Sequence, residues 1–494
     1  MSSLYLGVDV GTSSTKGVIV DSQGNLLAQA VRQHKVDNPK PGFFEMDARI
    51  WWEEFTSITQ ELCAAPDVTS NKIRAVGTSG MGPCVGIADE DMNPLAPTIL
   101  YGVDSRATQE IEELNAAFGE DTIYDIGGSY LSSQAGGPKF RWLANNNPQA
   151  FEAARRFFMP ATYLAYQLTG QYVMDHQSAS QLDPLYDLGN KTWNRQYCRA
   201  VLGNMETPEL RWGNEQAGTV TTQAARETGL PQGIPVITGT IDAWAEGVSA
   251  DAVNPGDLML MYGTTLFLIC TGQKRMSYPS LWGTAGVCPD TFSLAGGMAT
   301  SGAITNWLEE LCGGPGFEAL TREAGASKAG AGGLLCLPYF AGERTPIADP
   351  QARGTLTGLT LSTTRGDLYR AVLEGTAFGV AHNIEAFESA GARIERLVAV
   401  GGGTKGGLWT EIVSSVTGKV QVIPKYSIGA SYGDAFMAAA AVEGLDAVDM
   451  ARWNPPARVI EPDPSLQGLY QEMFARYREL YEQTKGVQHY LASL

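Results

Sequence analysis

Histidine, paired cysteines and clustered basic residues are scarce or absent in this sequence, and each absence excludes a class of protein. The 494 residues include four histidines, and their spacing fits no metal site. The seven cysteines are scattered without a C-x-x-C pair, which favours a reduced, intracellular protein. Lys and Arg form no cluster, and the net charge is −18, so a nucleic-acid partner is not expected.

Long apolar runs are also missing. No segment is long enough to span a bilayer, and the first residues lack the basic region and apolar core of a signal peptide. We therefore expect a cytoplasmic protein without a membrane partner. An acidic protein that binds an anion must do so with local groups, namely backbone N–H groups, helix N-termini and metal ions.

Glycine, by contrast, is abundant, with 57 residues, and strand and helix signals alternate along the chain. The expected strands are 5–10, 16–20, 26–30, 73–79, 233–239, 258–262, 266–271 and 397–400. The expected helices are 49–62, 108–118, 138–146, 160–168, one after Asp242, 367–389, 409–417, 433–443 and 465–483. Gly170 is placed to end the helix at 160–168.

The chain is too long for one ordinary core, so two domains are expected. A strand, a Gly-Thr-hydroxyl turn and a second strand occur at Gly11 and again at Gly263. The second occurrence follows Pro255-Gly256, where turn chemistry suits a domain boundary. We therefore place the boundary near residues 250–256, which gives domains 1–249 and 250–494.

The first candidate site follows the first strand. Asp9 comes at the end of this strand, and the turn after it supplies Gly11, Thr12 and Ser13. A glycine turn with hydroxyl groups can donate short hydrogen bonds to phosphate, Asp9 can hold Mg²⁺, and Lys16 can meet phosphate as a point charge. An ordinary hairpin with a polar turn is an equal alternative for this segment alone.

The second and third candidate sites are also strand ends. Asp242 follows the strand that ends near Gly239, where a kinase would need a base beside the attacking hydroxyl group; an N-cap is the alternative role. Gly401 to Gly407 follow the strand at 397–400 and would let a nucleotide lie on bare backbone, although a flexible loop is the alternative. A Walker A loop is absent, and G-x-G-x-x-G does not occur with the following acidic residue that a dinucleotide site would need.

In this order, the three segments resemble those of the FGGY carbohydrate kinases, and the resemblance covers nearly the whole chain. Its most specific part is Gly401-Gly402-Gly403-Thr404-Lys405-Gly406-Gly407-Leu408-Trp409, with Gly418 beyond it. A further match is Pro338 to Arg344 with Pro346, which is similar to the family's P-x-x-x-G-E-R-x-P loop.

The resemblance implies an α/β fold of two actin-like, ribonuclease H-like domains, with the catalytic cleft between them. It implies ATP and Mg²⁺ as cofactors, with Asp9 associated with the metal and Asp242 as catalytic base. The residues implied to bind the nucleotide are Gly11, Thr12, Ser13, Lys16, Gly263, Thr264, Thr265, Gly402, Gly403 and Thr404.

The sugar site is where the resemblance is weakest. Xylulokinases carry Gly-Gln-Met-His-Gly after the strand at 73–79, whereas this chain has Gly80-Met81-Gly82-Pro83, and the Arg-Glu pair of glycerol kinases is absent too. Asp104-Ser105-Arg106 resembles the family's D-x-R element, and 42–52 resembles a xylulokinase segment. The residues implied to contact the sugar are therefore Met81, Gly82, Asp104, Arg106 and Asp242.

We expect a small-molecule substrate, a ketopentose such as D-xylulose. Ribulose, another polyol and a gluconate-like sugar are the alternatives, and a homodimer is the option considered for assembly. Two rival functions remain: an actin-like ATPase, which would lack the signature around Trp409, and a sugar-binding protein without turnover. The presence of both Asp9 and Asp242 speaks against the second rival.

Overall fold

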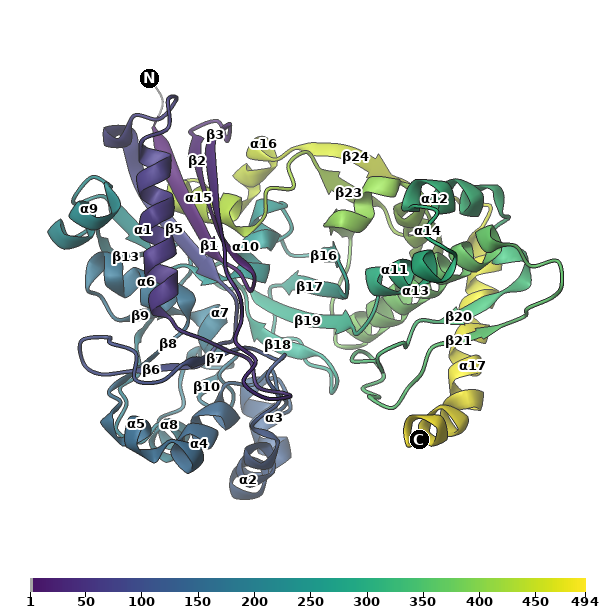
Figure 1. The fold of residues 1–494 in the computed structure, drawn as a ribbon, viewed down its shortest axis with the longest axis horizontal. Coiled ribbons are helices and arrows are strands. Elements are labelled where there is room, and N and C mark those ends of the chain that lie inside the picture. The colour runs from purple at the N-terminus through teal and green to yellow at the C-terminus, as the bar shows by residue number, and fades with distance from the viewer. Residues whose placement is uncertain (1–2) are drawn as a thin grey trace.

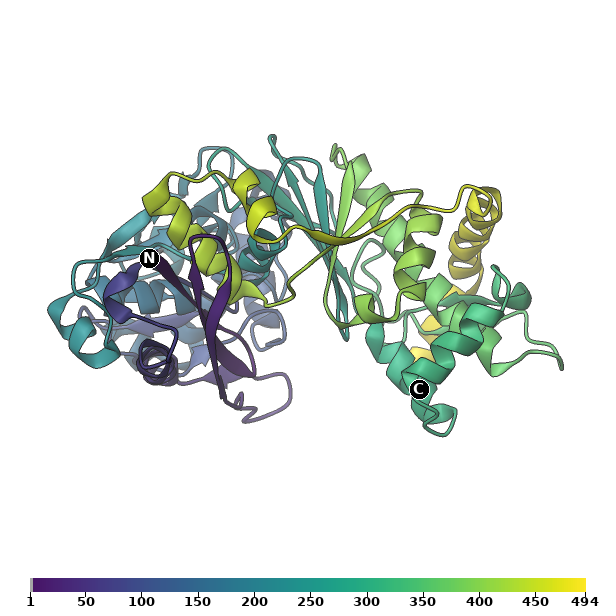
Figure 2. The same ribbon diagram turned by 90° about the horizontal axis from the view of Figure 1, so that it is seen from above.

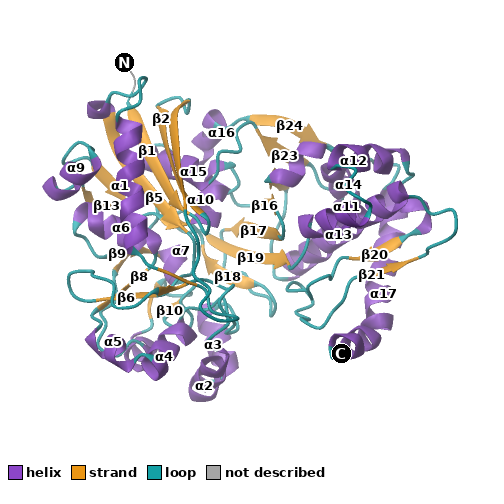
Figure 3. Ribbon diagram, viewed as in Figure 1, coloured by secondary structure: helices purple, strands orange, loops and turns teal. Residues whose placement is uncertain are grey.

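A computed structural model describes residues 3–494 as two mixed sheets, each covered by helices (Figures 1 and 3). The first sheet has the order β13-β14-β5-β1-β2-β3, and β15 also pairs with β5. Its strands are β1 (Leu4–Val10), β2 (Ser14–Asp21), β3 (Leu26–Gln33), β5 (Ile73–Gly80), β13 (Gln216–Thr219), β14 (Pro235–Ile237) and β15 (Thr240–Ile241).

The second sheet repeats this plan with the order β18-β19-β17-β16-β22-β23-β24. Its strands are β16 (Asp257–Tyr262), β17 (Leu266–Gly272), β18 (Trp282–Ala285), β19 (Phe292–Met298), β22 (Arg396–Val400), β23 (Gln421–Pro424) and β24 (Pro456–Ile460). In each sheet the first strand forms a hairpin with the next strand and runs parallel to a later one. The sequence repeat at Gly11 and Gly263 therefore reflects a structural repeat.

Short two-stranded pairs and helices complete the fold. The pairs are β4 (Glu45–Met46) with β7 (Thr98–Ile99), β6 (Gly86–Ala88) with β8 (Arg156–Phe158), β9 (Val173–Asp175) with β12 (Glu209–Arg211), β10 (Tyr186–Asp187) with β11 (Thr192–Trp193), and β20 (Leu335–Leu337) with β21 (Thr355–Thr357). The helices of the first 250 residues are α1 (Arg49–Cys63), α2 (Thr108–Phe118), α3 (Glu120–Gly127), α4 (Gly137–Asn146), α5 (Pro148–Ala153), α6 (Pro160–Thr169), α7 (His176–Ala179), α8 (Arg195–Val201), α9 (Thr222–Thr228) and α10 (Asp242–Ser249).

The remaining helices lie after residue 300, among and after the later strands. They are α11 (Gly302–Leu311), α12 (Phe317–Ala326), α13 (Arg365–Ser389), α14 (Leu408–Thr417), α15 (Ala430–Glu443), α16 (Met450–Trp453) and α17 (Gln467–Ala492). The long helix α13 begins at a capping box in which Thr364 and Asp367 bond each other's backbone N–H groups. Its buried side chains pack under the second sheet, in the core that also contains Leu258 and Leu397.

Helix α15 lies on the first sheet, although it comes late in the chain (Figure 2). It packs against β1 and β5 because both strands carry glycine where the helix crosses them. A Cβ atom on Gly7 would come within 1.9 Å of the carbonyl oxygen of Ser431, and one on Gly77 within 2.1 Å of that of Asp434. The alanine-rich surface of α15 thus approaches the strands at backbone distance.

The chain consequently crosses between the sheets three times. It leaves the first sheet after α10, returns at α15 and leaves again after α16, where Asn454 Nδ2 donates to the carbonyl oxygen of Ser249 at 2.7 Å. Trp453 packs beside Tyr5, on the first strand. The division into 1–249 and 250–494 stays a prediction, and residues 430–453 of its second part lie on the first sheet.

The helix and strand expectations agree well with the structure. The helix expected at 160–168 is α6, and Gly170 ends it in the left-handed conformation with φ 71°. The tail helix differs most, because α17 begins at Gln467 and continues to Ala492, beyond the expected end at 483. Buried Gln488 near its end bonds the loop after β20 and so extends the helix's contacts. Among residues 3–494, no helix is long and apolar enough to cross a membrane.

Candidate active site

Two of the predicted acidic residues meet at one edge of the first sheet. In the strand register, Asp9 of β1 and Thr240 of β15 both lie opposite Ser79 of β5, one on each side. The three strands are parallel, so their carboxyl ends share an edge, and Asp242 follows β15 directly. The structure therefore brings Asp9 and Asp242 together from opposite ends of the first domain's sequence.

Asp242 is the first residue of helix α10. Its Oδ1 accepts a hydrogen bond from the N–H of the next residue, Ala243, at 2.7 Å, whereas Ile241 holds the N-cap position of α10 and makes no side-chain cap bond. Burial raises the pKa of Asp242 to about 6, so the carboxylate is ionised at neutral pH and can still accept a proton. Asp242 is therefore not the N-cap that the sequence offered as the alternative, and its role as base stays a prediction.

Further carboxylates crowd this edge. Burial, followed by the charges of Asp242 and Glu246, raises the pKa of Asp9 well above its ordinary range. Burial, followed by the charge of Asp9, does the same to Asp434 of α15. The hydroxyl group of Ser79 joins the two, with its Oγ 3.3 Å from Asp9 Oδ1 and 2.7 Å from Asp434 Oδ2. Such a concentration of negative charge is stable only with cations or protons to offset it.

Lys16 is the cation that the first sheet supplies. Its Nζ donates to the carbonyl oxygen of Ile428 at 2.9 Å, in the loop that leads into α15. Its charge also lowers the pKa of Asp9 and of Glu246 against the effect of burial, which raises both. Lys16 is therefore at the carboxylate cluster, and contact with phosphate stays a prediction.

The first predicted phosphate turn connects β1 and β2. The N–H of Gly11 donates to the carbonyl oxygen of Ser14 at 3.0 Å and closes the turn. The hydroxyl group of Thr12 lies 3.0 Å from that of Tyr101, while Ser13 is exposed. The turn thus presents backbone and hydroxyl groups beside Asp9.

The second predicted turn, between β16 and β17, also begins with a glycine whose N–H closes it, but the closing bond spans one residue fewer. The N–H of Gly263 donates to the carbonyl oxygen of Thr265 at 3.0 Å, and Thr264 and Thr265 are exposed. Helix α11 begins against this turn, because Gly302 N–H donates to the carbonyl oxygen of Gly263 at 3.0 Å. A Cβ atom on Gly302 would come within 2.5 Å of that oxygen, so the close approach needs glycine.

A cavity of about 820 Å³ opens beside the second turn. Gly402 and Gly403 line it, in the short 3₁₀ segment Gly402–Gly406, together with the ring of Trp409. A volume of this size suits a ligand such as a nucleoside. Its other lining residues are Tyr262, Gly263, Thr264, Gly302, Thr305, Asn306, Phe317, Glu318, Thr321, Arg322, Tyr369, Leu373, Lys405 and Gly406.

Two predicted nucleotide residues of the second domain stand outside this lining. Thr404 is buried, and its hydroxyl group donates to the carbonyl oxygen of Gly401 at 2.8 Å, so it shapes the glycine segment. Thr265 follows the turn and is exposed. Binding of ATP by either residue stays a prediction.

The described residues contain no group of three His, Cys, Asp or Glu side chains arranged as a protein-only metal site. Mg²⁺ nevertheless fits this edge, because it commonly uses one or two carboxylates and takes its other ligands from water and phosphate. Asp9 would be the carboxylate that holds it. Bound there, Mg²⁺ would offset negative charge on the carboxylates and on a nucleotide's phosphates.

The predicted sugar residues fall into two groups. Met81 and Gly82 follow β5 next to Asp242: the N–H of Met81 donates to the carbonyl oxygen of Val10, and a Cβ atom on Gly82 would come within 2.6 Å of the Ile241 side chain. Met81 and Gly82 are thus close to Asp242, and sugar contact by them stays a prediction.

Asp104 and Arg106 form the second group and bond each other. Arg106 Nη2 lies 2.8 Å from Asp104 Oδ2 and 3.0 Å from Glu45 Oε2, and its guanidinium stacks over the ring of Phe43. Asp104 Oδ2 also accepts from the N–H of Phe44 at 2.6 Å. These bonds fix the segment 43–45, and direct contact of either side chain with a sugar stays a prediction.

Several residues at the site were not singled out from the sequence. Tyr101 and Asp434 gave no local signal, because each reaches the site only through tertiary packing. Glu246 gave a weak one, since it lies four residues after Asp242 and therefore on the same face of α10. Arg344 belonged to a recognised segment but had been given no role.

The comparison with known proteins agrees with this arrangement. Residues 4–248 match the N-terminal domain of the FGGY family of carbohydrate kinases, and residues 258–442 match its C-terminal domain. The xylulose kinase of Rhodospirillum rubrum has a similar structure, with a TM-score of 0.92 and 29% identity over 98% of this chain and 100% of that one.

Two curated relatives show the same likeness in sequence. A xylulose kinase of Staphylococcus epidermidis is 27% identical over 98% of both chains. A ribulokinase of Mycolicibacterium smegmatis is 31% identical over 75% of this chain and 70% of its own. The two matched domains and these relatives account for the paired sheets, the repeated glycine turns and the actin-like fold, so this chain belongs to the FGGY family of carbohydrate kinases.

Proposed function

We propose that this carbohydrate kinase transfers the γ-phosphoryl group of ATP to a hydroxyl group of D-xylulose. The observation that carries the proposal is the meeting of Asp9 and Asp242 at one edge of the first sheet, beside the first glycine turn. Asp242 takes the proton of the attacking hydroxyl group, and Asp9 holds Mg²⁺. The second turn and the cavity at Gly403 hold the rest of the nucleotide.

Xylulose is favoured over other sugars by likeness over the whole chain. The xylulose kinases of Rhodospirillum rubrum and Staphylococcus epidermidis both align over 98% of this chain. Ribulose is the second candidate because the ribulokinase of Mycolicibacterium smegmatis is 31% identical, although it aligns over only 75% of this chain. Met81 and Gly82 stand where xylulokinases carry the Gln-Met-His motif. We expect this segment to discriminate between xylulose and ribulose.

The test is a coupled assay of ADP release with a panel of sugars. D-Xylulose, L-xylulose, D-ribulose, L-ribulose, glycerol and D-gluconate are compared by kcat/KM at saturating ATP and Mg²⁺. We expect the highest value for D-xylulose. A higher value for ribulose would transfer the assignment to the second candidate, and ADP release at the same rate without any sugar would instead favour the ATPase rival.

A further inference from the structure

An arginine of the second domain, Arg344, lies beside the second phosphate turn, because the Met298 that it bonds pairs with Leu266, the residue after Thr265. Arg344 belongs to the loop after β20, and the residue is exposed to solvent. Its side chain makes one hydrogen bond, from Nη2 to the carbonyl oxygen of Met298 at 2.9 Å. Within the described residues 3–494, no carboxylate forms an ion pair with it. Most of its N–H donors are therefore available to a ligand.

Tyr101 of the first domain is close enough to Arg344 for their charges to interact. Tyr101 also interacts electrostatically with Asp242. The hydroxyl group of Tyr101 is in turn 3.0 Å from that of Thr12, in the first phosphate turn. Tyr101 thus bonds the first turn and interacts electrostatically with Asp242 and with Arg344 of the second domain.

The loop that carries Arg344 is held in place by the residue before it. Glu343 Oε1 accepts from the N–H of Ala299 at 2.7 Å and from the N–H of Arg344 at 2.8 Å. The backbone of Glu343 pairs with that of Asp349, at 2.8 and 2.9 Å. Burial of Glu343 and these bonds fix the starting point of the Arg344 side chain.

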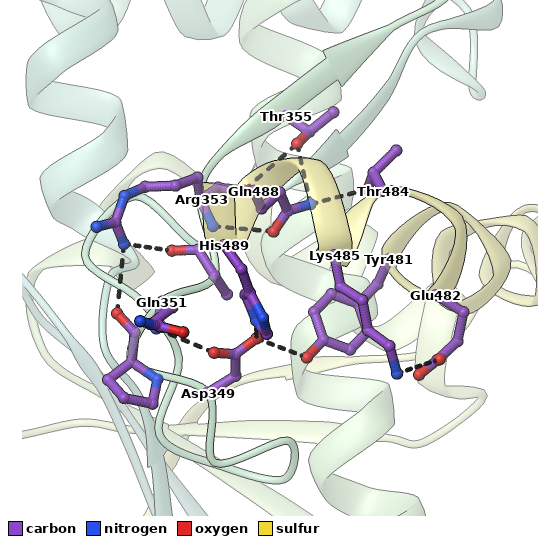
Figure 4. A network of polar contacts seen from close by, with 12 residues as sticks. Asp349, Gln351, Arg353, Thr355, Tyr481, Glu482, Thr484, Lys485, Gln488 and His489 are labelled. Carbon is purple, nitrogen blue, oxygen red and sulfur yellow. Dashed lines mark hydrogen bonds and ion pairs between the residues drawn. The ribbon is translucent and has the colours of Figure 1, made fainter. Parts of the chain in front are cut away.

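Helix α17 forms hydrogen bonds to the same loop (Figure 4). Asp349 Oδ2 accepts from the hydroxyl group of Tyr481 at 2.8 Å and lies 2.7 Å from His489 Nε2. Gln488 Oε1 accepts from the N–H of Arg353 at 2.9 Å. A loop anchored at both ends in this way keeps a functional side chain in a defined position, as catalysis requires.

The negative charge at the site favours a further cation. Asp9, Asp242, Glu246 and Asp434 lie at or beside the site, and within the described chain Lys16 is the cation that interacts with Asp9 there. ATP would add further negative charge at the same place. A guanidinium suits phosphate because its planar donors can form two parallel hydrogen bonds to the oxygens.

We propose that Arg344 is a further catalytic residue, which binds the γ-phosphoryl oxygens of ATP during transfer. The sugar hydroxyl oxygen forms a bond to the γ-phosphorus, and the bond from that phosphorus to the bridging oxygen of ADP breaks. ADP leaves with the electron pair, and the hydroxyl proton goes to Asp242. Arg344 stabilises the charge on the transferring group from the second domain, and this role rests on the proposed kinase reaction.

The test compares Arg344→Ala and Arg344→Lys with wild type. Steady-state kcat and the Kd of ATP without sugar are measured, and guanidinium chloride is added at low millimolar concentration as a chemical rescue. The matched control is Arg353→Ala, because Arg353 is in the same loop and, in the described part of the chain, its guanidinium bonds the carbonyl oxygens of Pro350 and Ala352 alone. Thermal melting of each variant reports whether it is folded.

We expect Arg344→Ala to lower kcat by about 10²-fold or more, since the lost contact forms in the transition state. The Kd of ATP should change less than threefold, Arg344→Lys should keep more activity, and guanidinium should restore part of kcat. A folded Arg344→Ala variant with more than a third of wild-type kcat would overturn the role, as would equal losses in both Arg344 variants without rescue. Inactive wild type would count against the proposed reaction instead.

Discussion

Lys16 and Ile428 are joined by a hydrogen bond of 2.9 Å between residues that lie more than 400 positions apart in sequence. The bond connects β2, beside the first phosphate turn, to the loop that leads into α15. The same Lys16 ammonium offsets the charges of Asp9 and Glu246. One side chain therefore ties the late helix to the site and balances part of the site's negative charge.

Lys16→Met should lower kcat/KM for ATP by about tenfold, because a charged hydrogen bond and its point charge are lost together. The exposed Lys35 provides the control, and Lys35→Met should leave kcat/KM unchanged. Steady-state kinetics at several ATP concentrations would measure both. An unchanged value for Lys16→Met would show that Lys16 only holds the loop.

Asp242→Asn should lower kcat by about 10²-fold or more, because the amide cannot accept the hydroxyl proton. The amide oxygen can still accept from the N–H of Ala243, so the start of α10 should remain intact. The Kd of ATP, measured by calorimetry, should stay within a few fold of wild type. Near-normal turnover would show that Asp242 is not the base.

Gly403→Val should raise the KM for ATP at least about tenfold and leave the KM for sugar nearly unchanged. A Cβ atom at Gly403 would meet the Tyr262 side chain at 2.9 Å and the Trp409 ring at 3.0 Å, so a larger side chain must intrude on the cavity. Gly325→Ala is the control, since no atom lies within 4 Å of its added Cβ. A normal KM for ATP would place the adenosine elsewhere.

Asp349→Ala should destabilise the protein by about 1–3 kcal/mol, because Tyr481 and His489 lose a shared buried acceptor. The kcat should also fall, because the loop of Arg344 loses its support from α17. Arg476→Gln, on the exposed face of the same helix, removes ion pairs worth little and serves as control. Thermal melts and kinetics on both variants test this, and a stable but fully active Asp349→Ala would contradict the second expectation.

His382 should make the protein less stable in acid. Burial, followed by the charge of Arg478, lowers the pKa of His382 from 6.5 to about 4, so the folded state favours the neutral ring. The stability that the neutral ring contributes is therefore fully present above pH 6.5. It is lost as the pH falls through about 4, and the total loss is about 3 kcal/mol.

His382→Phe removes this titration, and its ring can pack against Phe474 and Tyr477 as the imidazole does. Urea unfolding of both proteins between pH 4 and pH 7 measures the difference. We expect the variant to lose less stability than wild type over this range. Parallel curves for the two proteins would show that His382 does not titrate in this way.

Much of the fold could be predicted because the chain's local patterns and its tertiary structure agree. The apolar run at β1, the turn at Gly11 and the left-handed Gly170 at the end of α6 each follow from nearby residues. The repeat of the turn at Gly263 indicated the second sheet. By contrast, nothing local shows that α15 packs on β1, since an alanine-rich helix fits either sheet.

The residues of the candidate site also fall into those that local sequence could predict and those that it could not. Asp9 and Asp242 were predictable because strand ends are the usual place for ligands in such sheets. Tyr101 and Asp434 were not, because their places depend on bonds to Thr12 and Ser79 from distant segments. The sequence also could not show that Asp104 and Arg106 are engaged with each other and with the segment 43–45.

The return of α15 to the first sheet has a consequence for biosynthesis. On the ribosome, β1 and β5 are made early, but the helix that covers them ends at Glu443. Until that residue has emerged, one face of the nascent sheet exposes apolar side chains and the glycines that α15 will contact. The first domain therefore cannot complete its fold during its own synthesis. Its uncovered sheet face stays accessible to chaperones until nearly the whole chain has been made.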